Sequence, residues 1–289
     1  MPENADTLDY VVPVSPDRFV LLHYHIFKNA GSTIEDALRR CFGNRSATVH
    51  GPDPNSILRG EDVAGFLVSH PEIAAISSHH VKYPKPVAPG VIVFDLCVLR
   101  DPLERLRSVY YHFRRAEPVD DLSARAKEMD LGSFLDLLIR KHPHLVNDVQ
   151  VNILANGAAY TRPPGSADLG AALAIVGKMS VVSVVDLFDE SLVAAEHYLQ
   201  PAFPSIQLEY MSQNVSPLAG PGCQFREEVD ETIYQRLEEL NQLDGELVSQ
   251  ARGEVRRRFG LVPDAQRRLA AFRGRCDRLE GALPRVTAV

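Results

Sequence analysis

A strand, a loop of small residues and a helix follow one another directly near the beginning of the chain. Arg18 to Ile26 (RFVLLHYHI) is rich in Val, Leu and aromatic side chains, which is typical of a buried strand. Beyond the loop, apolar side chains recur at helical spacing and form one stripe, made of Ile34, Ala37, Leu38 and Cys41. This order predicts a βα unit in which the loop Lys28–Thr33 meets the N-terminus of a helix.

The same alternation of strands and helices continues along the chain. Further strands are predicted at Ile73–Ser78, Val91–Leu99 and Ser180–Val185. Helices are predicted at Glu61–Ser69, after Asp101-Pro102, and at Leu131–Lys141, Leu145–Asn156, Glu190–Leu199, Glu227–Leu240 and Asp244–Phe259, whereas Gly43–Gly60 is predicted to be an irregular loop. Strands that alternate with helices predict an α/β fold, with a mostly parallel central sheet flanked by helices and ligands at the carboxyl ends of the strands.

Composition and charge narrow the class of protein. The 289 residues are 45% hydrophobic and 24% charged, which suits one large globular domain or two closely joined ones. The net charge of −7 argues against broad nucleic-acid binding, which needs many Lys and Arg contacts to phosphate. The four cysteines lie far apart without a Cys-x-x-Cys pair, so reduced thiols are expected at Cys41, Cys97, Cys223 and Cys276.

Neither a signal peptide nor a membrane span is indicated by the sequence. Met1–Tyr10 lacks the basic start and the apolar run of a signal peptide. The longest apolar stretch, Val91–Leu99, is interrupted by Asp95 and is far shorter than the roughly 20 residues that cross a bilayer. A cytoplasmic location is therefore expected.

The loop Lys28–Thr33 (KNAGST) has the composition of an anion-binding site. A loop between a strand and a helix points several backbone N–H groups at one place, and the helix N-terminus adds a partial positive charge there. Small residues let an anion approach the backbone, two hydroxyl groups can donate hydrogen bonds, and Lys28 supplies a mobile charge. A simple tight turn with a solvated lysine is the alternative interpretation of the same residues.

A nucleotide kinase or NTPase is a second hypothesis for such a loop. A Walker A loop carries its lysine immediately before the Ser or Thr, whereas here Lys28 precedes the glycine. The run Val-Ile-Val-Phe-Asp95 imitates a Walker B strand, but the apolar pattern continues to Leu99 and places Asp95 inside the strand. Both departures weaken the kinase hypothesis.

A dense group of arginines follows the strand Val91–Leu99. Five of them lie within a short span of an otherwise acidic chain, at Arg100, Arg105, Arg107, Arg114 and Arg115. Asp101 is a favourable N-cap and Pro102 a favourable first residue for the next helix. One face of this helix is apolar and is predicted to pack, while the opposite face is predicted to be free for chemistry and carries Arg105, Ser108, His112 and Arg115.

Both segments resemble elements of a known enzyme family. His25 to Thr33 (HIFKNAGST) resembles the 5′-phosphosulfate loop of sulfotransferases that use 3′-phosphoadenosine 5′-phosphosulfate (PAPS), in the branch that includes heparan sulfate 2-O-sulfotransferase and its bacterial relatives. Leu99 to Tyr111 (LRDPLERLRSVYY) resembles the 3′-phosphate element of the same family. Shorter similarities occur at Asn147–Gly157, Val185–Leu192 and Leu240–Leu247, although the family helix often carries a Thr-Arg pair where this chain has Val151-Asn152.

The resemblance implies a P-loop-NTPase-like sulfotransferase fold and in-line transfer of a sulfuryl group from PAPS to a hydroxyl of an acceptor. Lys28 is then catalytic, since an ammonium can stabilise the leaving 5′-phosphate, and Arg100 and Ser108 hold the 3′-phosphate. The implied PAPS-binding residues are Lys28, Asn29, Ala30, Gly31, Ser32, Thr33, Arg100, Ser108 and Asn214. No metal is expected. A non-catalytic protein that binds the product, 3′-phosphoadenosine 5′-phosphate (PAP), is a third hypothesis.

The acceptor hydroxyl needs a base, and histidine titrates nearest to neutral pH. His79 and His80 follow the strand Ile73–Ser78 on the ligand side of the expected sheet, and adjacent strand residues point to opposite faces. His80 is predicted to be the base, because the family's histidine is soon followed by an aromatic residue and a turn, as in His80-Val81-Lys82-Tyr83-Pro84. The next candidate is Glu35. Two further histidines, His23 and His25, are expected to be core imidazoles.

Three parts of the chain are expected: an N-terminal extension at 1–17, a sulfotransferase domain at 18–261 and a basic helical tail at 262–289. The weak apolar stripe of Ala265–Arg285 suits either packing on the domain or an oligomer contact. Variable segments, here Gly43–Gly60, Val81–Gly90 and Pro118–Met129, are expected to build the acceptor pocket. The sequence does not identify the acceptor.

Overall fold

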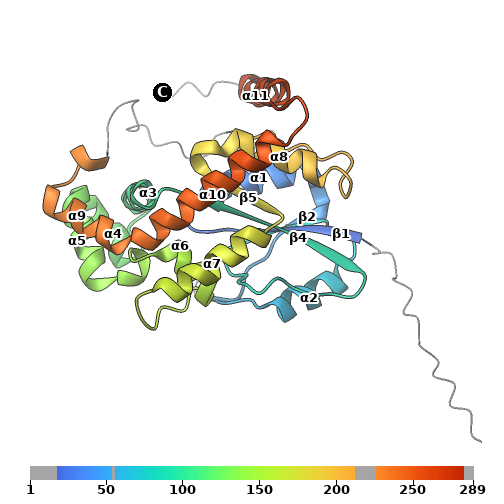
Figure 1. Cartoon of the computed structure of the whole chain (residues 1–289). Helices are drawn as coiled ribbons and strands as arrows, with labels where there is room; N and C mark the ends of the chain where they lie inside the picture. The colour runs from blue at the N-terminus through green and yellow to red at the C-terminus, as the bar shows by residue number, and fades with distance from the viewer. Residues whose placement is uncertain (1–17, 54–55, 212–224, 283–289) are drawn as a thin grey trace, which may run out of the picture.

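The central element of the fold is one five-stranded sheet in which every neighbouring pair of strands is parallel (Figure 1). The computed structural model describes residues 18–53, 56–211 and 225–282. Within these residues the strand order is β2-β3-β1-β4-β5, formed by β1 (Arg18–Tyr24), β2 (Ser46–Thr48), β3 (Ala75–Ser78), β4 (Val91–Leu99) and β5 (Val181–Val184). The predicted α/β fold with a mostly parallel, helix-flanked sheet is confirmed.

β1 lies in the middle of the sheet and pairs with β3 on one side and β4 on the other. Leu21 therefore lies opposite both Ala75 and Phe94. Successive side chains of a strand point to opposite faces, so Leu21 and its neighbour Leu22 belong to two different apolar clusters. Because both faces are buried, β1 and β4 have nearly continuous apolar sequences.

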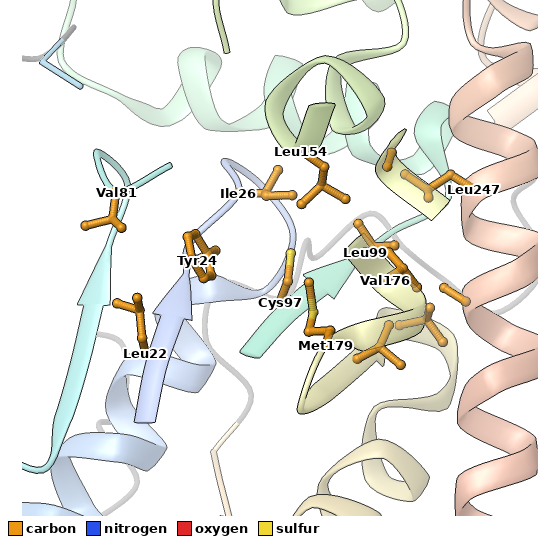
Figure 2. Packing of buried hydrophobic residues seen from close by; sticks show 14 of the residues in the cluster. Leu22, Tyr24, Ile26, Val81, Cys97, Leu99, Leu154, Val176, Met179 and Leu247 are labelled. Carbon is orange, nitrogen blue, oxygen red and sulfur yellow. The ribbon is translucent and has the colours of Figure 1, made fainter. Parts of the chain in front are cut away.

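Helices cover both faces of the sheet (Figure 1). One face packs against α1 (Gly31–Phe42), α8 (Phe188–Leu199) and α11 (Ala265–Ala282), and the other against α2 (Gly60–Ser69), α6 (Val149–Asn156), α7 (Ser166–Lys178) and α10 (Gln242–Gly260). Figure 2 shows the second of these cores, in which Leu22 and Tyr24 of β1 lie near Cys97 of β4. The figure also labels buried side chains of β4 and of the segments that cover this face, among them Leu99, Leu154, Val176, Met179 and Leu247.

A separate group of helices follows β4 in the chain and has its own apolar core. It consists of α3 (Pro102–Arg115), α4 (Asp121–Glu128), α5 (Leu131–Lys141) and α9 (Glu231–Leu240). The start of α3 is the predicted one, since the Asp101 carboxylate accepts hydrogen bonds from the backbone N–H groups of Leu103 and Glu104, both at 3.1 Å. This cap fixes the direction in which α3 leaves the sheet directly after Arg100.

Three elements differ from those that the sequence pattern predicts. β2 lies within Gly43–Gly60, predicted to be an irregular loop, because its short polar sequence forms a strand only by pairing with β3. α4 lies within Pro118–Met129, where the pattern indicates only a loop. α7 mixes small and apolar residues (SADLGAALAIVGK), so its sequence has no single apolar stripe that would predict a helix. In addition, α6 begins at Val149 instead of Leu145, because Pro143–Leu145 forms a separate 3-10 turn.

The C-terminal helix α11 packs on the domain, which is one of the two roles open from its sequence. Phe272 is fully buried, and two arginines pair with carboxylates outside the helix, Arg273 with Asp189 at 2.7 Å and Arg275 with Glu196 at 2.5 Å. The extension 1–17 lies outside the described residues. In the parts of the chain that the structure describes, no helix combines the length and the apolar character that a membrane span needs.

Candidate functional site

The loops after β1 and β4 lie side by side at the point of the sheet where the order of strand addition reverses. The chain continues from β1 to β2 and β3 on one side and places β4 on the other side of β1, with Tyr24 paired to Cys97 near the carboxyl ends. In open parallel sheets, a crevice for ligands forms at such a switch point. The residues that follow β1 and β4 here are the loop Lys28–Thr33 and Arg100.

The backbone of the loop adopts conformations that are uncommon for its residue types. Lys28 and Ala30 have φ angles of 67° and 57°, in the left-handed region that non-glycine residues rarely occupy. Such strain is concentrated at ligand-binding segments of proteins. No side chain caps the N-terminus of α1, which starts at Gly31, and the exposed Ser32 lies in its first turn. The first N–H groups of α1 are therefore suited to bind an anion.

Gly31 is required here by the packing of a histidine ring. A Cβ atom at this position would lie 1.8 Å from Cδ2 of His25, far inside van der Waals contact. The sequence suggested that this glycine lets an anion approach the backbone. The structure adds a second reason, since the His25 ring occupies the space beside the first turn of α1.

Gln150 of α6 joins the loop after β1 to the residue after β4. Its Oε1 accepts hydrogen bonds from Asn29 Nδ2 at 2.7 Å and from the backbone N–H of Arg100 at 3.0 Å. Its Nε2 donates to the Arg100 carbonyl oxygen at 2.8 Å, and the Arg100 guanidinium donates to the Lys28 carbonyl oxygen at 3.1 Å. One fully buried amide thus holds both segments at a fixed separation.

Asp244 of α10 holds the start of α6, the helix that carries Gln150. Its carboxylate accepts the backbone N–H groups of Gln150 at 3.0 Å and Val151 at 2.8 Å, at the start of α6. Asp244 is fully buried, and burial raises the pKa of its carboxyl group. The sequence pattern gave no sign of this pairing, although Gln150 and Asp244 both lie in segments with a shorter family similarity, Asn147–Gly157 and Leu240–Leu247.

The two predicted elements bring positive charges together. Burial, followed by the nearby charges of Arg115 and Arg100, lowers the pKa of Lys28 to about 8. His112, one turn before Arg115 on α3, has its pKa lowered by burial, Lys28 and Arg115. Ser108 lies half-buried on the same helix. An electropositive place of this kind favours a ligand with several negative charges.

The predicted free face of α3 is only partly free, and Arg105 does not belong to it. Arg105 is 1% exposed and donates from Nη2 to the Leu145 carbonyl oxygen at 2.7 Å. Its neighbour Arg107 is also buried and forms an ion pair with Glu228. Both side chains hold α3 against surrounding segments, because this helix is covered on more than its apolar side. Ser108, His112 and Arg115 remain accessible.

Asn29 and Asp95 are both engaged inside the protein. Asn29 is buried, and its Nδ2 donates to the Val98 carbonyl oxygen at 2.9 Å as well as to Gln150. Its side chain therefore shapes the loop. Asp95 lies inside β4, as predicted, and accepts hydrogen bonds from Tyr83 and from Ser180, each at 2.7 Å. It is not at the carboxyl edge where a Walker B aspartate acts.

A column of histidine rings lies beside the loop, on the α1 face of the sheet. His23 and His25 are buried, as predicted, with ring centroids 5.2 Å apart, and the His25 ring stacks on that of His79 at 3.5 Å. Burial, followed by the neighbouring histidines, lowers the pKa of His25 to about 2, so its ring is neutral. Glu35 Oε2 lies 3.8 Å from His25 Nδ1.

His79 and His80 have different hydrogen-bond partners. His79 Nδ1 is bonded to the carbonyl oxygen of His25 at 3.0 Å, whereas His80 Nδ1 accepts the backbone N–H of Gly51 at 2.8 Å. His79 thus lies against the loop that follows β1, and His80 lies against the segment that follows β2. Among the described residues, no group of three or more His, Cys, Asp or Glu side chains is placed to hold a metal ion.

The remaining predicted site residues are divided between the described and the undescribed parts of the chain. Ala30 is half-buried and Thr33 is buried, both within the loop and first turn of α1. Asn214 lies outside the described residues.

Comparison with known proteins gives a distant relationship. No model of a known protein family matches the chain. An uncharacterized protein of Archaeoglobus fulgidus is 24% identical over 245 residues, which cover 79% of this chain and 94% of the relative. The similarity extends over most of both chains, and the description of this relative gives no activity.

Proposed function

We propose that this protein is a sulfotransferase that moves a sulfuryl group from PAPS to a hydroxyl of an acceptor, on a P-loop-NTPase-like sulfotransferase fold. The observation that carries the proposal is the set of hydrogen bonds made by Gln150. Through it, the loop Lys28–Thr33 and Arg100 lie at one switch point of the sheet. These are the segments that resemble the family's 5′-phosphosulfate and 3′-phosphate elements.

The proposed reaction assigns a distinct task to each group. In an in-line displacement, the acceptor oxygen bonds to sulfur while the bond from sulfur to the 5′-phosphate oxygen breaks, and negative charge builds on that leaving oxygen. The Lys28 ammonium and the N–H groups at the start of α1 stabilise this charge. Arg100 and Ser108 hold the 3′-phosphate, with a charge-assisted contact from Arg100.

Ligand preference tests the proposal against the kinase hypothesis. PAP without magnesium is expected to raise the unfolding temperature of the protein, because a ligand at a hundred times its Kd stabilises the native state by about 2.7 kcal/mol. ATP with magnesium is expected to do much less. A larger effect of ATP with magnesium would support a kinase or NTPase and contradict the proposal.

A transfer assay then separates the enzyme from a non-catalytic binder. Labelled PAPS is incubated with a panel of sugars, lipids and small alcohols, with and without a chelator. Transfer to at least one acceptor, unchanged by the chelator, is expected because the proposed stabilisation of charge comes from protein groups. Stabilisation by PAP without transfer to any acceptor would instead indicate a PAP-binding protein.

A further inference from the structure

The hydrogen bonds of His79 and His80 determine which ring nitrogen of each carries the proton. The catalytic role of the two rings rests on the proposed sulfotransferase function, but their protonation pattern follows from the hydrogen bonds alone. A neutral imidazole has one N–H donor and one bare acceptor nitrogen, and a hydrogen bond at one nitrogen fixes the state of the other. The partners of these two rings are of opposite kinds.

His79 is held with a bare Nε2. A carbonyl oxygen can only accept, so the 3.0 Å contact with the His25 carbonyl requires the proton of His79 on Nδ1. Within the described residues, no hydrogen bond engages its Nε2. The bare nitrogen is therefore the one that can accept a proton from a substrate.

His80 is held in the opposite form. The backbone N–H of Gly51 can only donate, so the 2.8 Å contact requires a bare Nδ1 on His80 and places the proton of the neutral ring on Nε2. In this form, the outer nitrogen of His80 is a donor and cannot remove a proton. His80 is suited to donate a hydrogen bond.

The surroundings also connect His79, through His25, to the proposed sulfuryl site. Its ring stacks at 3.5 Å on that of His25, and the His25 ring fills the space beside Gly31 in the first turn of α1. His80 instead contacts Gly51, and its ring lies 5.4 Å from that of His50. Only one histidine ring separates His79 from the anion-binding loop.

We propose that His79, and not the predicted His80, is the base of the transfer reaction, and that His25 is its positioning residue. The acceptor O–H proton passes to Nε2 of His79 as the acceptor oxygen forms its bond to sulfur. The bond from sulfur to the 5′-phosphate oxygen breaks, and PAP leaves with that electron pair. The His25 carbonyl holds the proton on Nδ1 of His79, and the stacked His25 ring holds the plane of the base.

Nitrogen NMR tests the protonation pattern without any assay of activity. The full-length protein, labelled with nitrogen-15 at histidine, is measured with PAP bound at slightly alkaline pH, and resonances are assigned with single variants. His79 is expected to show a protonated Nδ1 and a bare Nε2, and His80 the reverse. A proton on Nε2 of His79 overturns the inference.

A matched pair of asparagine variants tests the catalytic assignment. In His79→Asn the side-chain amide can still donate to the His25 carbonyl, and in His80→Asn the amide oxygen can still accept from Gly51, while each variant lacks the outer ring nitrogen. Transfer by His79→Asn is expected to fall by at least about 10²-fold with PAP affinity unchanged. His80→Asn is expected to stay within a few-fold of the wild type. The reverse pattern, or two active variants, overturns the proposal.

A third variant tests the positioning role of His25. In His25→Ala the backbone carbonyl stays, but the stacked ring is lost, so kcat is expected to fall while the His79 resonances broaden or shift. Unchanged kcat and unchanged His79 resonances contradict this role. Failure of the proposed function is recognised separately, because the wild type then neither binds PAP nor transfers sulfuryl groups. In that case the assignment of His79 as the base is also wrong.

Discussion

Replacing Gly31 by alanine isolates one steric contact at the candidate site. The backbone of Gly31 lies outside the left-handed region, so alanine is compatible with its conformation. In a helix, alanine is otherwise more favourable than glycine by up to about 1 kcal/mol. The added Cβ would lie 1.8 Å from the buried His25 ring, so the substitution is expected to destabilise the protein solely through this contact.

The magnitude follows from the geometry around the ring. His25 stacks on His79 and is buried, so it cannot move away without disturbing His79 and the loop. Insertion of a methyl group into a packed interior costs about 1–3 kcal/mol. We therefore expect the free energy of unfolding of Gly31→Ala, measured by urea denaturation, to be lower than that of the wild type by about 1–3 kcal/mol.

Gly170→Ala is the matched control, because Gly170 lies within a helix, is exposed and has no atom within 4 Å of the place that an added Cβ would take. This control is expected to stabilise the protein by about 0.5–1 kcal/mol. In the double variant His25→Ala/Gly31→Ala, the effect of Gly31→Ala should disappear, because the ring that it strikes is gone. If Gly31→Ala is as stable as the control, the close packing of the two residues is not as described.

Three further outcomes are expected in binding and kinetic experiments. Arg100→Ala should weaken PAP binding by about 1.5–3 kcal/mol, as measured by calorimetry. The binding of adenosine 5′-phosphosulfate, which lacks the 3′-phosphate, should stay nearly unchanged. Equal weakening of the binding of both ligands contradicts the assigned contact. Lys28→Ala should lower kcat by roughly 10²-fold, with a smaller change in PAP affinity. A variant with normal kcat and a raised KM would contradict a role of Lys28 in the transition state. Because the pKa of Lys28 is lowered to about 8, its charge is present below that pH and lost above it, so kcat/KM should fall as the pH rises through about 8. In Lys28→Arg this alkaline limb should move beyond the measured range, because the guanidinium stays charged, and a limb that persists belongs to another group.

The segments that the sequence predicted well are those whose signals are local. The strand, loop and helix from Arg18 to Phe42 are encoded by neighbouring residues, and so is the Asp101 cap that starts α3. The position of Asp95 inside β4 also followed from the apolar pattern, which continues beyond it to Leu99. In each case the signal lies in residues that are close together in the sequence, so a single sequence carries the information.

The parts that could not be predicted depend on distant partners. Arg105 lies on the face of α3 that helical periodicity leaves free, and only the Leu145 carbonyl, brought there by another segment, explains its burial. The ring nitrogen that carries the proton in His79 and in His80 likewise depends on whether the partner is a carbonyl or an N–H, supplied by His25 and Gly51. Residue type alone contains neither piece of information.

The support of the loop by Gln150 and Asp244 has a consequence for synthesis of the protein on the ribosome. Asn29 and Gln150 are 121 positions apart, and Gln150 and Asp244 are a further 94 apart. Chains emerge from the ribosome N-terminus first, and contacts between distant positions must await the later partner. The loop Lys28–Thr33 is therefore among the first segments translated and among the last to be held in its final form. A nascent chain arrested before α10 has the whole loop but lacks the carboxylate that anchors its support.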